Sequence, residues 1–165
     1  MAKFSGIVQG KVASEPDGLG RVRVSLAFME GDSQTYWAHV AAIMTGPGRG
    51  VWFMPEIGDD VLLAFDQNNA DIAYIIGFLW NGVDRPPTTD GNVRMIRSVN
   101  GHEITIYDPQ VAGGDTGYIS IADAHGNEII LQNANISIRS TGTINIQAPN
   151  VIINGRPVAV APKPI

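Results

Sequence analysis

Residues 128–139 read EIILQNANISIR, and the pattern that decides the fold is concentrated in this stretch. Ile129 and Leu131 form an aliphatic-x-aliphatic pair, and Ile136 and Ile138 form a second pair after four polar or small residues. Apolar and polar residues that alternate with a period of two are typical of a β-strand with one buried face. The stretch therefore predicts two short strands joined by a turn.

The same pair recurs throughout the C-terminal part of the chain. From Ile129 onward, the first residues of successive pairs are separated by 7, 8 and 7 residues, and Asn, Ser, Thr, Gln and Gly fill the intervals. A repeat this short is typical of a β-solenoid or β-helix, in which each turn buries only two side chains. The pairs are Ile104/Ile106, Ile119/Ile121, Ile129/Leu131, Ile136/Ile138, Ile144/Ile146 and Val151/Ile153.

One chain with strands this short has too little sequence per turn to close a solenoid and bury these pairs. Three copies wound around one axis close it, because each chain contributes one face and the pairs meet at the centre. We therefore expect an intertwined homotrimeric β-prism, a triple-stranded β-helix, over residues 101–155; the alternative is a monomeric meander or an aggregate paired through strand edges. The expected trimer core is Ile119, Ile121, Ile129, Leu131, Ile136, Ile138, Ile144, Ile146, Val151 and Ile153.

The N-terminal half has a different pattern. The 19 glycines and 10 prolines of the chain leave no convincing helical window, and short alternating runs predict strands at residues 4–12, 21–26, 36–41, 60–65 and 73–78. A small antiparallel barrel removes exposed strand edges, and the OB-fold is a common solution at this size. The fold class is therefore all-β, with an OB-fold-like barrel over residues 1–84, a Pro-rich polar linker over 85–100, the trimeric β-prism over 101–155 and a C-terminal segment over 156–165.

Composition excludes several classes of protein. The chain has 165 residues, a net charge of −5, 44% apolar residues and no cysteine. Disorder, disulfide staples and zinc-thiolate or thiol chemistry are therefore not expected. The acidic balance also argues against a protein that grips phosphate backbones. Because no apolar run resembles a membrane span or a signal peptide, we expect a soluble protein made without a signal peptide.

No motif in the sequence predicts catalysis or a cofactor. His39, His102 and His125 do not have the spacing of metal ligands. Glu56, Asp59 and Asp60 form the densest carboxylate cluster, but they lie in a Pro-Glu-Ile-Gly-Asp-Asp stretch that is typical of a turn. The glycine-rich residues 46–50 lack the Lys-Ser/Thr ending of a phosphate loop, which favours a barrel loop. We therefore expect no enzyme activity, no metal and no cofactor.

Four stretches of the N-terminal half resemble a known family. These are DGLGRVRV at 17–24, YWAHVA at 36–41, GVWFMPEIGDDVL at 50–62 and YIIGFLWNG at 74–82. Together with the I-x-I repeats, they resemble the OB-fold domain and β-helix of spike proteins in contractile injection machines. This family includes phage baseplate assembly protein V, the VgrG proteins of type VI secretion and the spikes of extracellular injection particles. The resemblance covers about residues 4–155.

The resemblance implies a structural spike at the centre of a phage-tail-like baseplate. It implies a barrel collar on hub or tube proteins, a needle that contacts the target membrane transiently, and a PAAR-type tip protein at the C-terminal end. The assembled particle, a virion or a phage-tail-like particle, would be built in the cytoplasm and could be released. The chain would be a minimal spike with a separate hub protein. The expected tip contacts are Pro157, Val158, Val160, Pro162, Pro164 and Ile165.

The alternative interpretation is an OB-fold protein that binds single-stranded nucleic acid. Trp37, Trp52 and Phe53 would then stack on bases, and Arg21 and Arg23 would contact phosphates. The net negative charge opposes this interpretation, and a fold by itself does not define a function.

Overall fold

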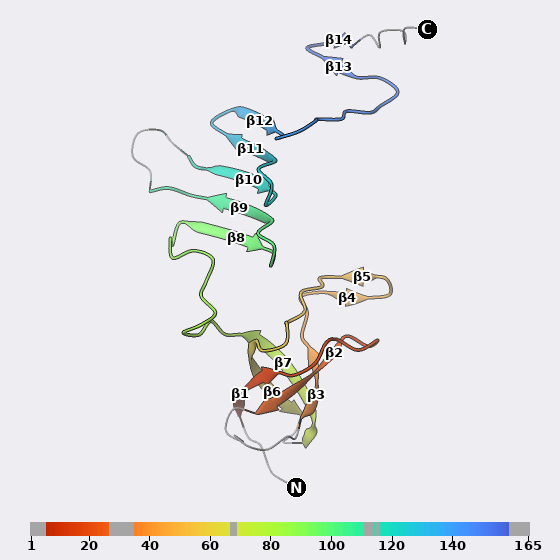
Figure 1. The fold of residues 1–165 in the computed structure, drawn as a ribbon, viewed down its shortest axis with the longest axis vertical. Helices are drawn as coiled ribbons and strands as arrows, with labels where there is room; N and C mark the ends of the chain where they lie inside the picture. The colour runs from red at the N-terminus through yellow and green to blue at the C-terminus, as the bar shows by residue number, and fades with distance from the viewer. Residues whose placement is uncertain (1–5, 27–34, 67–68, 111–113, 115, 159–165) are drawn as a thin grey trace. The chain divides into compact units, whose positions relative to one another are not determined.

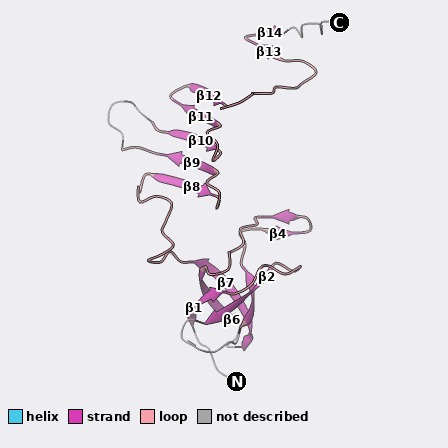
Figure 2. Ribbon diagram, viewed as in Figure 1, coloured by secondary structure: helices cyan, strands magenta, loops and turns pink. Residues whose placement is uncertain are grey.

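Strands with alternating inward and outward side chains build both halves of the chain (Figure 1). The computed structural model describes residues 6–26, 35–66, 69–110, 114 and 116–158. Every regular element in these residues is a β-strand, which confirms the all-β prediction (Figure 2). None of the described elements is a helix long and apolar enough to cross a bilayer. The chain divides into two compact units, residues 1–86 and 87–165, which are described separately below.

The N-terminal unit contains a closed five-stranded barrel in the order β1-β2-β3-β7-β6. All neighbours are antiparallel except β3 and β7, which are parallel. Closure leaves no open sheet edge, and it confirms the expected barrel, although the β3–β7 pair makes the barrel mixed and not wholly antiparallel as predicted. Its strands are β1 (Ile7–Val12), β2 (Arg21–Leu26), β3 (Tyr36–Val40), β6 (Asp60–Asp66) and β7 (Asn69–Phe78).

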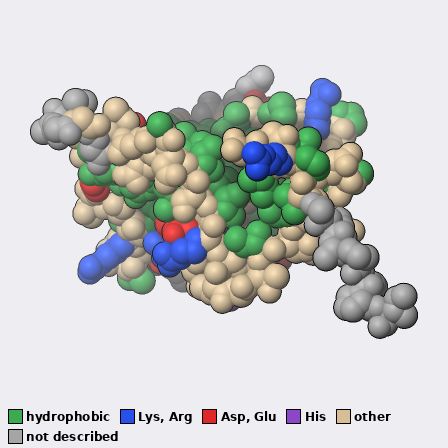
Figure 3. Space-filling view, turned by 90° about the horizontal axis from the view of Figure 1, so that it is seen from above, with side chains coloured by type: hydrophobic (Ala, Val, Ile, Leu, Met, Phe, Trp, Pro, Cys, Tyr) green, Lys and Arg blue, Asp and Glu red, His purple; other side chains and the backbone are tan. Residues whose placement is uncertain are grey.

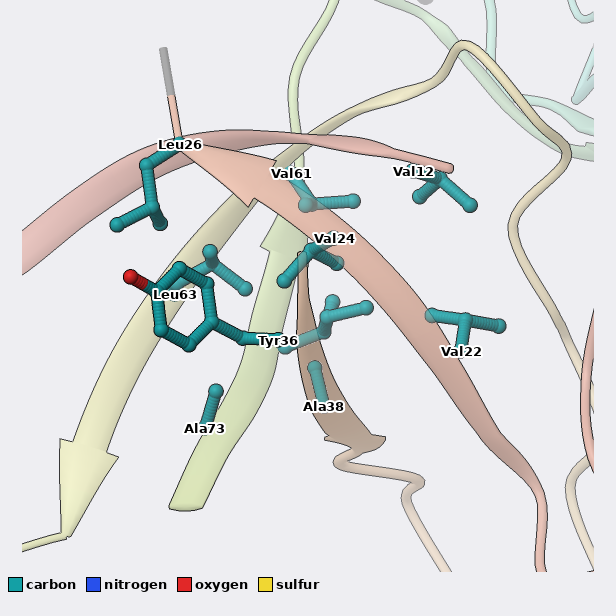
Figure 4. Packing of buried hydrophobic residues seen from close by; sticks show 10 residues of the cluster. Val12, Val22, Val24, Leu26, Tyr36, Ala38, Val61, Leu63 and Ala73 are labelled. Carbon is teal, nitrogen blue, oxygen red and sulfur yellow. The ribbon is translucent and has the colours of Figure 1, made fainter. Parts of the chain in front are cut away.

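The barrel buries its core within one chain (Figure 4). The alternation in β2 places every second side chain inside, and the core members are between 0% and 9% exposed. Gly10 lets β1 approach this core, because a Cβ there would lie 2.6 Å from Leu63 Cδ1 and 2.8 Å from the Ser25 carbonyl oxygen. The core consists of Val12, Val22, Val24, Leu26, Tyr36, Ala38, Val61, Leu63, Ala73 and Ile75.

The second unit contains a five-stranded antiparallel meander in which each strand pairs with the next along the chain (Figure 1). It does not form the intertwined prism within one chain; that arrangement remains a prediction about several copies. The first strand lies inside the linker predicted over 85–100, where nearby prolines and polar residues hid its short apolar pattern. The strands are β8 (Val93–Arg97), β9 (Glu103–Tyr107), β10 (Tyr118–Ala122), β11 (Glu128–Gln132) and β12 (Asn135–Arg139).

Two small hairpins complete the described fold. The glycine-rich stretch expected to be a barrel loop forms β4 (Thr45–Gly46) and β5 (Arg49–Gly50). Near the C-terminal end of the described residues, β13 (Ile152–Ile153) pairs with β14 (Arg156–Pro157). Their connection uses Asn154 at φ 51° and Gly155 at φ 73°, the left-handed pair that two-residue hairpin turns require.

Three hairpins share one turn design, at residues 17–21, 98–102 and 123–127. In each, the first residue's side-chain oxygen accepts a hydrogen bond from the fifth residue's N–H, at 2.9, 3.0 and 2.9 Å respectively. The fourth residue is a glycine with positive φ, and its N–H donates to the carbonyl of the first. An Asp or Ser followed three residues later by Gly therefore fixes three strand connections.

The connection between β11 and β12 contains a residue that the turn does not favour. Ala134 has φ 62°, and its neighbour Asn133 has φ 46°. We expect Ala134→Gly to raise the free energy of unfolding by roughly 0.5–1 kcal/mol, because relief of left-handed strain outweighs the added chain entropy of glycine. Thermal and urea unfolding followed by circular dichroism measure the change. Ala122→Gly, within strand β10, is the matched control and should be destabilising; a similar loss in both variants would contradict the prediction.

Candidate functional site: the aliphatic face of the five-stranded sheet

The register of β8–β12 places the aliphatic residues on one face in two columns. Residues directly opposite each other on neighbouring strands share a face. The pairings Ile121↔Ile129 and Ile119↔Leu131 continue to both sides through the neighbouring strands. One column is Ile96, Ile104, Ile121, Ile129 and Ile138, and the other is Ile106, Ile119, Leu131 and Ile136. We call these nine residues the aliphatic face.

The aliphatic face is open in the single chain. Its side chains are all large aliphatics, yet they are between 38% and 69% exposed. A contiguous apolar surface of this kind is rare on a monomeric protein and indicates an interaction site. Figure 3 shows hydrophobic side chains gathered on the surface, with Lys and Arg side chains near them.

The opposite face of the sheet is less exposed than the aliphatic face and mixes polar residues with Met95 and Ile130. The Thr105 hydroxyl is buried there without a hydrogen-bond partner among the described residues. Thr105 and Ser120 are paired across strands there and are only 5% and 8% exposed. Cross-strand ion pairs flank them, Arg97 with Glu103 at 3.8 Å and Arg139 with Glu128 at 3.4 Å. On the same face, at the other end of strands β9 and β10, the ring centroids of Tyr107 and Tyr118 lie 5.3 Å apart. The sheet is therefore two-sided, and its large exposed aliphatic side chains are concentrated on the aliphatic face.

The structure places the predicted core residues in two groups. Ile119, Ile121, Ile129, Leu131, Ile136 and Ile138 lie together on the aliphatic face. The other four lie beyond β12: Ile144 and Ile146 are exposed and belong to no strand, Val151 is half-buried, and Ile153 is exposed in β13. Of the predicted tip residues, Pro157 and Val158 are exposed, whereas Val160, Pro162, Pro164 and Ile165 lie outside the described residues.

The predicted core omitted Ile96, Ile104 and Ile106, which the register adds to the aliphatic face. The Ile104/Ile106 pair was visible in the sequence, but it lies outside the regular spacing of 7 and 8 residues. Ile96 has no second aliphatic partner, because Arg94 occupies the equivalent position opposite Ile106. Cross-strand pairing therefore identifies more members of the aliphatic face than the spacing of residues along the chain does.

The barrel residues considered for nucleic-acid binding make contacts within the chain. The guanidinium carbons of Arg21 and Arg23 lie 4.9 and 4.7 Å from the centre of the Trp37 ring. Arg21 is also paired with Asp17 at 2.7 Å, and Arg23 donates to Thr35 Oγ1 at 3.0 Å. Both cations are thus engaged, and the geometry gives no support to a phosphate-binding role.

The candidate carboxylates and histidines also have structural contacts. The Glu56 N–H donates to Asp59 Oδ2 at 2.8 Å, which is the turn expected from the sequence. Two of the three histidines come together, with the rings of His102 and His125 6.2 Å apart. His102 Nδ1 accepts a hydrogen bond from the Ala124 N–H at 3.3 Å. Within the described parts of the chain, no group of three or more His, Asp or Glu side chains could hold a metal ion.

The closed barrel and the two-sided sheet define the class of the protein: a small β-barrel module joined to a sheet of short strands. Residues 4–80 match the family model of the type VI secretion system/phage-baseplate injector OB domain. Over these residues the chain is similar to the OB domain of this injector family, which supports the resemblance to baseplate spike proteins of the VgrG type. The family indicates a structural part of a phage or type VI secretion particle that assembles with other baseplate or tail components. No curated protein matches the chain.

Two turn carboxylates have lowered pKa values. For Asp17, the pKa falls below the ordinary 3.8 chiefly because its carboxylate accepts the Arg21 N–H, with help from the Arg21 side chain and the Leu19 N–H. For Asp123, the side-chain amide of Asn127 has the largest effect on the pKa, followed by the Asn127 and His125 N–H groups. Both turns therefore favour the charged carboxylate.

These lowered pKa values predict a loss of stability in acid. A carboxylate with a lower pKa in the folded state stabilises the fold above its unfolded pKa, and this contribution disappears as the pH falls through the folded value. Asp123→Asn should lower the melting temperature near neutral pH, and the two melting temperatures should converge as the pH falls through the lowered pKa of Asp123. Melting curves across this range measure the difference. Asp108→Asn, an exposed carboxylate outside such a turn, is the control; a constant gap at every pH would contradict the prediction.

Proposed function

We propose that this chain is the central spike of a contractile phage-tail-like injection assembly and works as a homotrimer. The observation that carries the proposal is the open aliphatic face, because nine large apolar side chains lie exposed together on one side of the sheet. The injector OB domain at residues 4–80 supports the same assembly from an independent part of the chain.

The width of the aliphatic face favours three copies over two. Each strand contributes two inward positions, which span about 6.7 Å along the strand. Two such narrow strips packed face to face would leave their long edges open to water. Three strips arranged around an axis enclose one another, so that each forms one side of a triangular prism. We therefore assign the aliphatic face to the interior of the trimer.

Residues beyond β12 support intertwining at the far end of the shaft. The segment with Ile144 and Ile146 belongs to no strand in the described part of the chain, and both side chains are more than half exposed. It nevertheless continues the aliphatic-x-aliphatic spacing. A buried segment needs hydrogen-bond partners for its backbone N–H and C=O groups. Strand pairing with sister chains would supply these partners. The prism over residues 101–155 would then be a triple-stranded β-helix in this region.

The proposed role is mechanical. A spike must transmit force without buckling, and a shaft in which many backbone hydrogen bonds share the load resists shear. The barrel would act as a collar on hub or tube proteins, and the residue 156–165 segment would present a PAAR-type tip protein. The assembled particle would lead penetration of a target envelope. This role requires no catalytic residue and no cofactor.

Native mass tests the proposal directly. Sedimentation equilibrium of the purified full chain should give three times the 17.6 kDa of one protomer, and an unboiled SDS gel should retain a band above the protomer. A folded species with the mass of one chain would overturn the spike proposal. A folded species with twice that mass would replace the prism with a two-sheet sandwich.

Two neighbouring residues of β12 allow the two faces of the sheet to be tested separately. Ile138 lies on the aliphatic face, and Ser137 precedes it in β12 on the opposite face. Ile138→Asp should abolish the trimer, because three carboxylates would meet in apolar surroundings at a cost of several kcal/mol each. Ser137→Asp introduces the same charge on the opposite face, away from the proposed axis, and should remain trimeric.

Light scattering with size-exclusion chromatography measures both masses. Monodisperse trimers of the Ile138→Asp variant would show that this side chain does not lie on the trimer axis.

A further inference from the structure

Three asparagines of the chain directly precede a glycine: Asn81, Asn100 and Asn154. An Asn-Gly sequence is open to a reaction within the chain, because glycine has no Cβ that would hinder its backbone nitrogen. That nitrogen attacks Cγ of the asparagine, and the attack needs an accessible N–H and a side chain that can turn toward it. The surroundings of each pair therefore decide which of the three reacts in the folded protein.

The side chain of Asn81 is held by four hydrogen bonds. Its Oδ1 accepts the N–H groups of Val83 and Asp84 at 2.7 and 2.6 Å. Its Nδ2 donates to the carboxylates of Asp60 and Asp84 at 2.6 and 2.9 Å. Rotation of the amide toward Gly82 would break these bonds, and the two carboxylates oppose the negative charge that the attacking nitrogen acquires. The folded structure therefore protects Asn81.

At the second site, the attacking nitrogen is already engaged. The Gly101 N–H donates a hydrogen bond to the Ser98 carbonyl oxygen at 2.9 Å, within the 98–102 turn. The Ser98 hydroxyl closes the same turn, because it accepts the His102 N–H at 3.0 Å. The Asn100 side chain is exposed, but attack on it requires the turn to open. The folded structure therefore protects Asn100 as well.

Asn154 and Gly155 form the two-residue turn between β13 and β14 (Figure 1). Both residues are exposed, and a Cβ at Gly155 would meet no atom within 4 Å. In the part of the chain that the structure describes, neither the Asn154 side chain nor the Gly155 N–H makes a hydrogen bond. Arg156 follows directly, and its positive charge favours the transient anion on the glycine nitrogen. This turn therefore holds neither of the two reacting groups.

We propose that Asn154 is a site of spontaneous deamidation. The Gly155 nitrogen forms a bond to Asn154 Cγ, and the side-chain nitrogen leaves as ammonia together with the proton of the Gly155 N–H. The product is a succinimide ring. Water then opens the ring: addition at Cγ gives aspartate, and addition at the backbone carbonyl carbon gives isoaspartate. Either product carries a negative charge that asparagine lacks.

The two products have different effects on the β13–β14 hairpin. Aspartate tolerates the left-handed conformation of residue 154, at φ 51°. Isoaspartate carries the backbone through its own Cβ and Cγ, so it lengthens a turn that joins Ile153 directly to its cross-strand partner Arg156. We expect isoaspartate to open this hairpin, at the start of residues 156–165. The reaction takes place within one chain, so it does not require the homotrimer.

Uptake of heavy oxygen from isotope-enriched water tests this site, because each ring opening leaves one oxygen atom of water in the product. The purified full chain is kept in mildly alkaline buffer, either native or unfolded in urea, and the three Asn-Gly sites are followed by peptide mass spectrometry. In urea, all three should react at similar rates. In the native protein, Asn154 should react close to its rate in urea, whereas Asn81 and Asn100 should react about tenfold more slowly, because attack there requires local opening.

The Asn154→Gln variant is the matched control. Its longer side chain closes the corresponding ring far more slowly, so heavy-oxygen uptake in the C-terminal peptide should be lost. Uptake that persists in this variant would place the reaction at another asparagine and overturn the proposal. Native Asn154 protected as strongly as Asn81 and Asn100 would also overturn it. The native mass of the same sample reports on the homotrimer separately, so failure of this inference and failure of the proposed function are distinguishable.

Discussion

The two-sidedness of the β8–β12 sheet is the constraint on which the proposed assembly depends. Side chains alternate along each strand, so a slip of one residue in any pairing would send a strand's aliphatic residues to the polar face. The register is therefore as important as the composition. Tight turns fix this register. Residues 98–102 and 123–127 use the same side-chain hydrogen bond and positive-φ glycine, and the β11–β12 turn uses the left-handed pair Asn133–Ala134. Hydrogen bonds and left-handed residues within these turns thus decide which face of the sheet is apolar.

The two units satisfy their apolar residues in different ways. In the barrel, Leu63 and Ile75 are at most 1% exposed, so that a single chain provides the whole core. In the sheet, residues of the same type remain more than a third exposed, as at Ile129 and Ile121. A barrel of this kind can form before assembly, whereas in the proposed trimer the apolar burial of the shaft would wait for other copies. Folding and assembly are therefore expected to be coupled in the second unit and separable in the first.

The sequence predicts features that depend on residues close together along the chain. It does not predict features that depend on contacts between strands. The alternation of Val22, Val24 and Leu26 identified a barrel strand because one face of that strand is buried within the same chain. The sequence pattern predicts a linker where β8 lies, because the apolar pattern of this strand is short and follows a Pro-rich stretch. The stacking of Arg21 and Arg23 on Trp37 depends on the β2–β3 register, which no local pattern contains. Residues with no partner inside the chain, such as Ile144, remain predictions about other copies.

Arg94 shows where the apolar interior has to begin. It lies opposite Ile106, in the column that continues with Ile119, so it occupies an aliphatic-face position in the first strand of the sheet. Its guanidinium lies 3.7 Å from the Asp108 carboxylate, and both side chains are mostly exposed. A charge with this exposure cannot be enclosed in an apolar core without a large desolvation cost. In the proposed trimer, the column that contains Arg94, Ile106 and Ile119 would therefore remain hydrated at β8 and become dry from β9 onward. The difference between Arg94 and Ile96 would then mark, within one strand, where the proposed enclosed shaft begins.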